Sequence, residues 1–591
     1  MFAPRIYRTG LIVVAMAVIV FGFSLEGQQG ALSTSVVPDA FNGANAFAAM
    51  NYMASQYPNR RPGSVDDTDL AAYVASQFAH SNLVVATSTF RARTVDGTRT
   101  LETVTGTVPG TSGSSIVIVA HRDALGSPAT ADLSGTATLI TLANVIAGET
   151  HTHAIVLAST SGSAGAAGAA QLAAALHGPI DAVIALGDLA GAEAREPIVV
   201  PWSADATLAA PLLRNTVAAI VGAQTGLAPG ANGLGGQFAH LALPLSLGEQ
   251  APFGALGYPA VLLSLSGVHD PGAHESVRDG TRLAELGQAL LQTIDALDGG
   301  PRVPAPSAYL IWKGNLIPAW ALRVLVAALL VPALLTTIDG AARARRRGHR
   351  LTPWLAWVLA GALPFVLALA VLVGIRYAGL IKVLPAGVVF GGVVATHARG
   401  VLILAALALV LALSFAFARP LVVRRLGHEL SATGATADAG AAAAVAVVIC
   451  AIAVVIWVRN PFAAALLVPA ANLWLWAVDP DRRLRGWLCA VLLVIGLAAP
   501  VLELVYYAQT LGLSAAAIPW NGALLLAGGQ VGALTALEWS IVGGCVVSLV
   551  AVLAGRRRVP ALPQPAPSAL RRRTNYAGPP SLGAARSAVR R

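Results

Sequence analysis

The chain has 591 residues, of which 56% are hydrophobic and 12% are charged, and its mean hydropathy is +0.68. This composition excludes a wholly soluble protein. The net charge of +10 comes largely from arginine blocks between apolar runs, so it indicates membrane topology and gives no sign of a nucleic-acid partner.

The amino-terminal segment predicts a membrane anchor. Arg5 and Arg8 precede an apolar run at residues 10–25. No small-x-small cleavage site follows directly, so we interpret residues 1–30 as an uncleaved anchor with the amino terminus in the cytoplasm.

Residues 36–299 have mixed polarity, and strand and helix patterns alternate along them. This alternation predicts an α/β domain with a mixed, mostly parallel sheet and helices on both faces. Strands are expected at residues 83–90, 116–120, 154–158, 182–186 and 260–265. Helices are expected near residues 43–56, 66–79, 132–147, 164–176, 208–223 and 281–297.

A Gly- and Pro-containing linker at residues 300–315 precedes an all-α, seven-span membrane domain at residues 316–555. The spans are expected at residues 316–338, 354–375, 401–418, 441–458, 462–478, 487–507 and 531–554. Arginine blocks at 343–350, 419–425, 482–485 and 556–558 recur after alternate spans. The positive-inside rule then predicts a multi-pass cell-membrane protein with both termini in the cytoplasm and an extracytoplasmic α/β domain.

Three further segments are distinctive by composition. Residues 556–591 are predicted to form a disordered basic cytoplasmic tail. The external segments 384–394 and 509–529 carry no charge. Each is either re-entrant or surface-lying, or an ordinary loop, and the sequence leaves both alternatives open.

The α/β domain carries four short motifs with polar side chains: Arg60-Arg61-Pro62-Gly63-Ser64, Ala120-His121-Arg122-Asp123, Gly187-Asp188-Leu189-Ala190-Gly191 and His274-Glu275-Ser276-Val277-Arg278-Asp279. In type and order they resemble motifs of the co-catalytic di-zinc aminopeptidases and glutamate carboxypeptidases, metallopeptidase family 28. The resemblance implies that His121, Asp188 and His274 are zinc ligands and that Asp123 orients His121.

Two departures from this family put zinc binding in doubt. An ungapped alignment places Ala131 at the bridging carboxylate, with Asp132 one residue late. The family's Glu-Glu pair falls on residues 159–163, where Ser159 and Ser163 are expected to form a cleft wall of small side chains. Two zinc ions need anionic ligands and a positioned base. The expected cofactor is therefore none, and the alternative is a single zinc held by His121, Asp188 and Asp132.

The order of domains is similar to that of membrane-bound peptidases of the endoplasmic reticulum and vacuole. It is also similar to the peptidase-like subunit of the glycosylphosphatidylinositol transamidase, which has lost zinc ligands. These resemblances favour a membrane-anchored peptidase-like protein with a degraded di-zinc site, a pseudoenzyme that binds a peptide, a lipid-linked substrate or a membrane-protein partner outside the cytoplasm. Whether it is an enzyme stays open.

Two alternatives remain. One is an active membrane-bound zinc exopeptidase with a rearranged site, in which Asp132 or Glu249 replaces the missing carboxylates. Glu249 and Gln250 lie in a segment that resembles the family's substrate-side Ser-Asp-His-x-x-Phe. The other is a transporter or lipid-handling membrane protein.

Two predictions of geometry follow. His121, Asp188 and His274 should lie around one cleft, within ~10 Å of each other. Arg323, Glu503 and Glu538 lie within apolar spans, so they should form either a polar pocket for a lipid head group or partner helix, or a structural Arg–Glu pairing.

Overall fold

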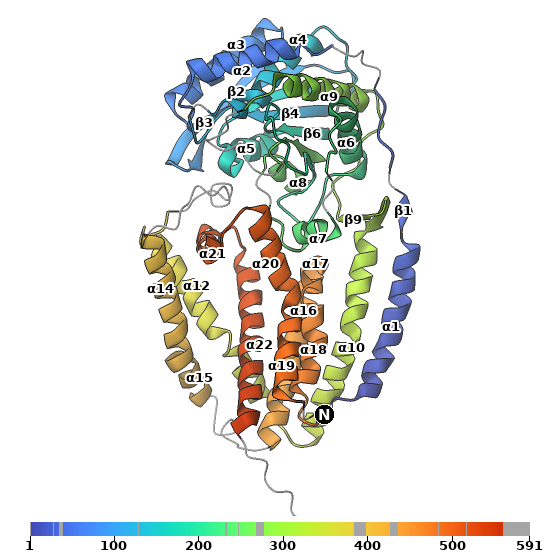
Figure 1. Ribbon diagram of the computed structural model, residues 1–591, viewed down its shortest axis with the longest axis vertical. Helices are drawn as coiled ribbons and strands as arrows, with labels where there is room; N and C mark the ends of the chain where they lie inside the picture. Colours follow the sequence, from blue (N-terminus) through green and yellow to red (C-terminus); the bar gives the residue numbers. More distant parts are fainter. Residues whose placement is uncertain are drawn as a thin grey trace, which may run out of the picture.

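The α/β domain and the apolar helices lie one above the other along the longest axis of the molecule (Figure 1). The computed structural model describes residues 2–27, 29–34, 40–127, 129–230, 233–245, 248–267, 277–382, 398–425, 435–482, 484–515 and 517–558. In these ranges every strand precedes Ala319, and only helices occur from that residue onward. The fold class is therefore as predicted, a mixed α/β domain joined to a helical region.

Seven strands form the central sheet: β2 (Val84–Thr94), β3 (Gly97–Val108), β4 (Ser115–His121), β5 (Ala154–Thr160), β6 (Ile180–Leu186), β7 (Val199–Val200) and β8 (Ala260–Leu263). Their order in the sheet is β2-β3-β5-β4-β6-β8-β7. The central strands β5, β4, β6 and β8 run parallel, as expected for strands joined by helical crossovers. The sheet is mixed because β2, β3 and β7 pair antiparallel at its edges.

Helices cover both faces of this sheet. One face packs against α2 (Gly43–Gln56), α3 (Val65–His80), α4 (Ser134–Ile146), α6 (Pro211–Thr225) and α9 (Gly280–Asp298). The other face packs against α5 (Ala167–Ala175) and α8 (Ala251–Ala255). Along β4, Ile116 and Ile118 enter the first core and Val117 and Val119 enter the second, because successive side chains of a strand point to opposite faces.

A second, three-stranded sheet joins the two ends of the α/β domain. It contains β1 (Glu26–Gly27), β9 (Tyr309–Trp312) and β10 (Asn315–Pro318), in the order β1-β10-β9. β1 follows α1 (Pro4–Phe23), and β10 leads into α10 (Ala319–Arg346). These two helices lie side by side (Figure 1). Gly10 permits the contact, because a Cβ atom there would lie 2.6 Å from the Cα atom of Pro332.

The remaining helices are α11 (Leu351–Leu359), α12 (Leu363–Tyr377), α14 (Ala398–Leu413), η3 (Ser414–Ala418), α15 (Arg419–Arg425), α16 (Ala435–Arg459), α17 (Pro461–Ala465), α18 (Val468–Val478), α19 (Gly486–Gly496), α20 (Ala498–Thr510), α21 (Ala517–Gly528) and α22 (Ala533–Arg558). Seven described helical segments, α1 among them, are long and apolar enough to cross a membrane. The bent pair α19–α20, with an angle of 49°, makes eight if it counts as one span.

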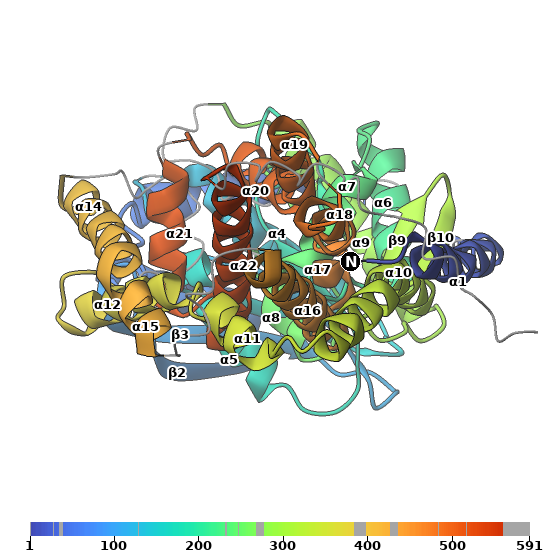
Figure 2. The same cartoon turned by 90° about the horizontal axis from the view of Figure 1, so that it is seen from below.

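The centre of the helical region is α16. It packs against α10, α11, α18 and α22. Seen from below, α12, α14 and α15 form a separate group at one side of this bundle (Figure 2). The apolar helices therefore support a multi-pass membrane protein.

The structure adds elements that the sequence patterns did not predict. β3 and β7 were not expected, and the predicted linker at residues 300–315 contains β9. The uncharged segment 509–529 contains α21 (Ala517–Gly528). The other uncharged segment, 384–394, and the tail from residue 559 lie outside the described residues.

Candidate functional site

The carboxyl ends of β4, β5 and β6 bring together the loops that carry the predicted site residues. β4 pairs with β6 in parallel, so His121 and Asp188 follow at the same edge of the sheet. On the other side of β4, Thr160 lies opposite His121. His274 lies outside the described residues, so the predicted meeting of His121, Asp188 and His274 stays a prediction.

The imidazole of His121 is buried against the carboxylate of Glu249. The Nδ1 atom of His121 lies 3.3 Å from Oε2 of Glu249, and Oε1 of Glu249 accepts a hydrogen bond of 2.7 Å from the Thr160 hydroxyl. His121 is 4% exposed and Glu249 is 5% exposed. Glu249 comes from the segment just before α8, far along the chain. It therefore approaches His121 as the rearranged-site hypothesis requires, and its chemical role stays a prediction.

Asp123 is wrapped by the loop at residues 162–163, directly after β5. Its carboxylate accepts hydrogen bonds from the backbone N–H of Gly162 (2.9 Å) and Ser163 (3.1 Å) and from the Ser163 hydroxyl (3.0 Å). The side chain is fully buried, and this burial raises the pKa of Asp123 to about 6 against the opposing effect of His121. The loop thus stabilises a carboxylate that is close to protonation at neutral pH.

Asp188 holds its own turn together. One oxygen accepts from the backbone N–H groups of Ala190 (2.9 Å) and Gly191 (2.8 Å), and the other accepts from the Ser266 hydroxyl (3.0 Å). Burial raises the pKa of Asp188, and these hydrogen bonds oppose the rise only in part. Both of its oxygens are therefore engaged by donors of this chain.

The segment with Asp132 is joined to the turn of Asp188. Asp132 lies in η1 (Thr130–Leu133), buried, directly before α4. The Ser134 hydroxyl donates to the carbonyl of Ala131 and accepts from the backbone N–H of Leu189 at 2.8 Å. This serine fixes Asp132 and Asp188 on adjoining loops.

A buried ion pair fixes the loops after β4 and β5. Arg122 is fully buried, and its Nε lies 2.9 Å from Oδ1 of Asp67. Its other nitrogens donate to the carbonyls of Ser159 and Glu102. Oδ2 of Asp67 accepts a hydrogen bond of 2.6 Å from the Ser161 hydroxyl. The middle residue of the His-x-Asp motif is thus a structural arginine with a full set of partners.

A second buried guanidinium, that of Arg60, lies beside this pair. It donates to the carbonyls of Arg122 (3.1 Å) and Ala129 (2.8 Å). Burial lowers the pKa of Arg60, and the charges of Asp132 and Asp123 oppose that change. Arg60 and Arg122 therefore supply fixed positive charge among the carboxylates of this edge.

The described side chains do not fit the two zinc ions that the family resemblance implies. In the described ranges no three His, Cys, Asp or Glu side chains are placed to hold one metal ion. A zinc ligand must direct a lone pair at the metal. Here both oxygens of Asp188 accept from protein donors, and Nδ1 of His121 faces Glu249. Since His274 is not described, the single-zinc alternative stays a prediction.

The other predicted cleft residues, Ser159, Ser163 and Gln250, differ in their hydrogen-bond partners. Ser163 bonds Asp123, whereas the Ser159 hydroxyl is buried and has no hydrogen-bond partner among the described residues. Gln250 donates to the carbonyl of Trp202 at 3.0 Å. The 159–163 segment therefore does border the His121 edge, and Gln250 connects that edge to the Trp202 region.

Arg323 does not pair with a glutamate in the part of the chain that the structure describes. It donates to the carbonyl of Val458 at 2.8 Å, and its guanidinium lies 5.3 Å from the ring centre of Trp457. Both partners are at the end of α16, which packs against α10, the helix that carries Arg323. The predicted Arg–Glu pairing of Arg323 is thus replaced by a carbonyl and an aromatic ring.

The two intramembrane glutamates have different surroundings. Glu538 on α22 pairs with Arg459 at the end of α16. Glu503 on α20 is buried, and its Oε1 has no hydrogen-bond partner among the described residues. These three predicted polar residues do not form one common pocket through any contact described here.

Sequence reasoning missed Thr160, Asp67 and Arg122 as residues of this edge. Asp67 is in the first turn of α3, where an acidic side chain is common, and Arg122 stood as the variable residue of a motif. A usable signal was present, because an arginine one residue beyond five apolar strand residues has to find a buried partner.

No protein-family model and no curated protein matches this chain. Among solved structures, it is similar to glutaminyl cyclase from Porphyromonas gingivalis, with 15% identity over 44% of this chain and 99% of that chain and a TM-score of 0.34. It is also similar to the aminopeptidase LapA of Legionella pneumophila, with 17% identity over 46% of this chain and 75% of that chain and a TM-score of 0.35. A zinc aminopeptidase of Bacillus subtilis has 10% identity over 43% of this chain and 94% of that chain, with a TM-score of 0.35. Since these TM-scores are below 0.5, the likeness carries no argument about this chain's chemistry.

Proposed function

We propose that this chain is a membrane-anchored peptidase-like binding protein with a degraded di-zinc site. Its α/β domain binds a peptide, a lipid-linked substrate or a membrane-protein partner outside the cytoplasm, with both termini in the cytoplasm. One observation carries the proposal. The carboxylates at the carboxyl edge of the sheet accept hydrogen bonds from this chain's own loops, and two buried arginines provide the neighbouring positive charge.

This arrangement suits binding better than metal-assisted hydrolysis. A di-zinc hydrolase needs its carboxylates available to the cations and a base beside the attacking water. Here Asp123 and Asp188 each orient a loop, and Glu249 is held between His121 and Thr160. Loops fixed in this way present backbone groups and hydroxyls to a ligand in a constant geometry.

The test is metal analysis of the purified full-length protein together with an aminopeptidase assay. We expect zinc well below one equivalent per chain, no turnover, and no change in metal content on His121→Ala substitution. Two equivalents of zinc with turnover, both lost in His121→Ala, would sink the proposal.

The second candidate is a hydrolase with a rearranged site, and the contact between Glu249 and His121 favours it. Glu249→Gln keeps the size and the hydrogen bond from Thr160 but removes the charge. If peptide hydrolysis is present and Glu249→Gln abolishes it while thermal unfolding is unchanged, the second candidate replaces the first. A matched control is Glu149→Gln, an exposed glutamate of the same domain.

The orientation in the membrane has its own test. Single cysteines at exposed Thr98 and at the cytoplasmic side, for example at Arg346, can be labelled in intact cells with a membrane-impermeant maleimide. The native cysteines are buried and serve as an internal background. We expect labelling at residue 98 and none at residue 346, and the reverse pattern would overturn the proposed sidedness.

A further inference from the structure

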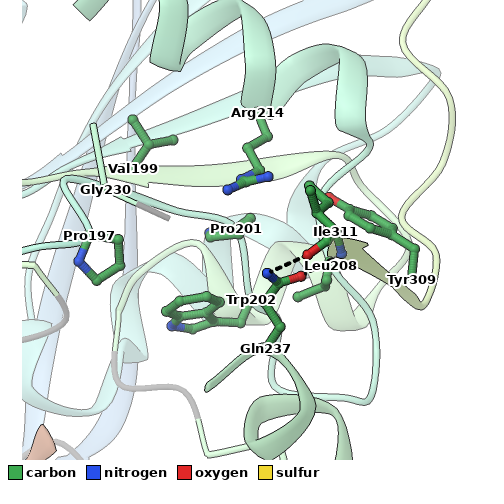
Figure 3. A pocket seen from close by; sticks show the side chains of 10 residues that line it. All are labelled: Pro197, Val199, Pro201, Trp202, Leu208, Arg214, Gly230, Gln237, Tyr309 and Ile311. Carbon is green, nitrogen blue, oxygen red and sulfur yellow. Dashed lines mark hydrogen bonds between the residues drawn. The ribbon is translucent and has the colours of Figure 1, made fainter. Parts of the chain in front are cut away.

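A pocket of the α/β domain, beside β9, is lined by residues from distant segments (Figure 3). Its enclosed volume is about 10 Å³, and it opens to solvent. Arg214 from α6, Gln237 from α7 (Leu234–Ala242) and Tyr309 from β9 line it, with Pro197 and Trp202. Figure 3 shows the Arg214 side chain pointing from α6 into the space between Pro197 and Tyr309.

Arg214 has no partner of its own in the described ranges: its guanidinium makes no ion pair and no hydrogen bond there. Burial lowers its pKa, and the only charge effect that opposes this comes from the Tyr309 phenol. The buried arginines Arg60 and Arg122, by contrast, each donate several hydrogen bonds to carbonyls. The difference marks Arg214 as a cation whose partner is not part of the described chain.

The position of Arg214 on its helix is also unfavourable without an anion. It lies in the first turn of α6 (Pro211–Thr225), where the helix dipole is already positive. A partly desolvated cation at this end is destabilised twice, by the loss of water and by the dipole. An anion in the pocket would reverse both effects, since helix amino termini favour negative charge.

The other polar groups of the pocket are engaged within the protein. The Tyr309 hydroxyl donates to the carbonyl of Ala209 at 2.6 Å. The amide of Gln237 donates to the carbonyl of Ile311 and accepts from its backbone N–H. The remaining walls are apolar or aromatic. The pocket thus offers one guanidinium in an apolar frame, which suits one anionic group with an apolar body.

The pocket is beside the chain segment that enters the membrane. Tyr309 and Ile311 belong to β9, and β10 runs directly into α10, the first long span after the α/β domain. Trp312 and Trp320 on this segment are 42% and 51% exposed, and the ammonium of Lys313 lies 5.4 Å from the Trp312 ring centre. Exposed tryptophans beside a lysine are typical of the level of the lipid head groups.

We propose that the Arg214 pocket binds a phosphate-type anion, supplied by the head group of an anionic phospholipid. The guanidinium would donate two hydrogen bonds to the phosphate oxygens. The enclosed part of the pocket would take a phosphate oxygen, and the glycerol would lie at the open mouth of the pocket. Among the described residues, none that is shown in contact with His121 lines this pocket. The test of the Arg214 pocket is therefore independent of the test of the proposed function.

The test is a titration of the detergent-purified full-length protein, followed by its thermal unfolding temperature. The probes are water-soluble dihexanoyl phosphatidylglycerol, the zwitterionic dihexanoyl phosphatidylcholine, and inorganic phosphate. We expect saturable stabilisation by phosphatidylglycerol, at least about tenfold weaker in Arg214→Gln and unchanged in Arg99→Gln, which alters an exposed arginine of the same domain. Phosphatidylcholine should stabilise more weakly.

Comparing the three probes distinguishes an anion supplied by a lipid head group from a soluble anion. Stabilisation by inorganic phosphate as strong as that by phosphatidylglycerol, and lost in Arg214→Gln, keeps the anion site but assigns it to a soluble anion. Equal responses of the wild type and Arg214→Gln to all probes overturn the proposal. If Arg214→Gln does not fold, Arg214→Lys keeps the charge and loses the two-pronged geometry. It should then bind phosphatidylglycerol more weakly than the wild type, and an unchanged affinity refutes the site.

Discussion

Both ends of the parallel strands carry histidines against buried carboxylates, yet the two clusters are built from different parts of the fold. At the amino ends, His153 lies between Asp181 (2.8 Å) and Asp298 (3.1 Å), and His151 contacts Asp298 and the carbonyl of Ile146. His151 and His153 lie directly before β5, Asp181 is in β6, and Asp298 is the last residue of α9. Every ring nitrogen of both histidines has a partner, so this cluster is a clamp between regular elements.

At the carboxyl ends, two of the corresponding side chains lie on loops. His121 is the last residue of β4, whereas Asp123 and Asp188 follow β4 and β6, and each of the three contacts a segment that is distant in sequence or a turn of its own. The buried arginines fix the loops after β4 and β5. The comparison teaches that a group of histidines and carboxylates does not define a site, because its meaning depends on whether strands, helices or loops hold it.

We call the carboxyl ends of the parallel strands, with the loops that follow them, the loop end. The largest expected effect comes from removing the Arg122–Asp67 ion pair, which fixes this loop end. Arg122→Met leaves Asp67 buried without its cation and should lower the free energy of unfolding by about 3–5 kcal/mol. The matched control is Arg61→Met, which breaks an exposed pair with Asp96 and should cost about 0.2–1 kcal/mol. Thermal unfolding of the detergent-solubilised protein measures both. Equal effects would mean that the loop end does not depend on its buried arginines.

A second effect is a pH dependence that belongs to the loop end. The pKa of Asp123 is raised from 3.8 to about 6 in the folded protein, so the folded state holds a proton that the unfolded chain has already lost between these values. The resulting stability is complete below pH 3.8 and is lost as the pH rises through about 6. A shift of about two units corresponds to about 3 kcal/mol at most.

Asp123→Asn should remove this dependence. Unfolding temperatures of the wild type and of Asp123→Asn, measured from pH 4.5 to 7, should therefore converge or cross as the pH rises, with the wild type losing more. Parallel curves over this range would show that Asp123 does not titrate there, and that the loop end carries no pH-sensitive carboxylate at this position.

The smallest effect is expected at the clamp. His153→Leu leaves Asp181 and Asp298 with fewer donors and should destabilise the domain by about 1–3 kcal/mol. The clamp is at the opposite end of the strands from Gly162 and Ser163. The rates at which these two amides exchange hydrogen through local opening should therefore be the same in His153→Leu as in the wild type. A change confined to those two amides would show that the two ends are coupled, and the distinction between clamp and loop end would fail.

The sequence predicted those parts of the fold whose signal is local. β4 and β6 are runs of apolar residues that are buried on both faces, and all residues of β6 are buried. β3 was missed because its residues 97–108 are rich in Thr and Gly, as suits a strand near the edge with one exposed half. The long apolar helices were predicted from runs of about twenty apolar residues, and seven of the described helical segments are long and apolar enough to cross a membrane.

The site was less predictable because its contacts are distant in sequence. The approach of Glu249 to His121 spans 128 residues, and that of Asp67 to Arg122 spans 55. Nothing in either local pattern selects one partner over another, since any buried arginine or histidine only requires some partner. The motif resemblance indicated which edge of the sheet to consider, but only tertiary structure could assign Thr160 and Asp67 to it.

The small β1-β10-β9 sheet has a mechanical consequence. The α/β domain leaves the membrane region at two chain crossings, and Glu26 and Gly27 pair with Leu316 and Asn315 where these crossings meet. A domain on one tether swivels freely about it, whereas two tethers joined by a ladder of hydrogen bonds resist twisting and leave bending as the easier motion. α7 adds a further contact, because Asn460 beside α17 donates to the carbonyl of Leu241 and Tyr507 of α20 donates to the carbonyl of Leu243. The α/β domain is thus held to the helices at two separate places, which opposes bending as well as twisting.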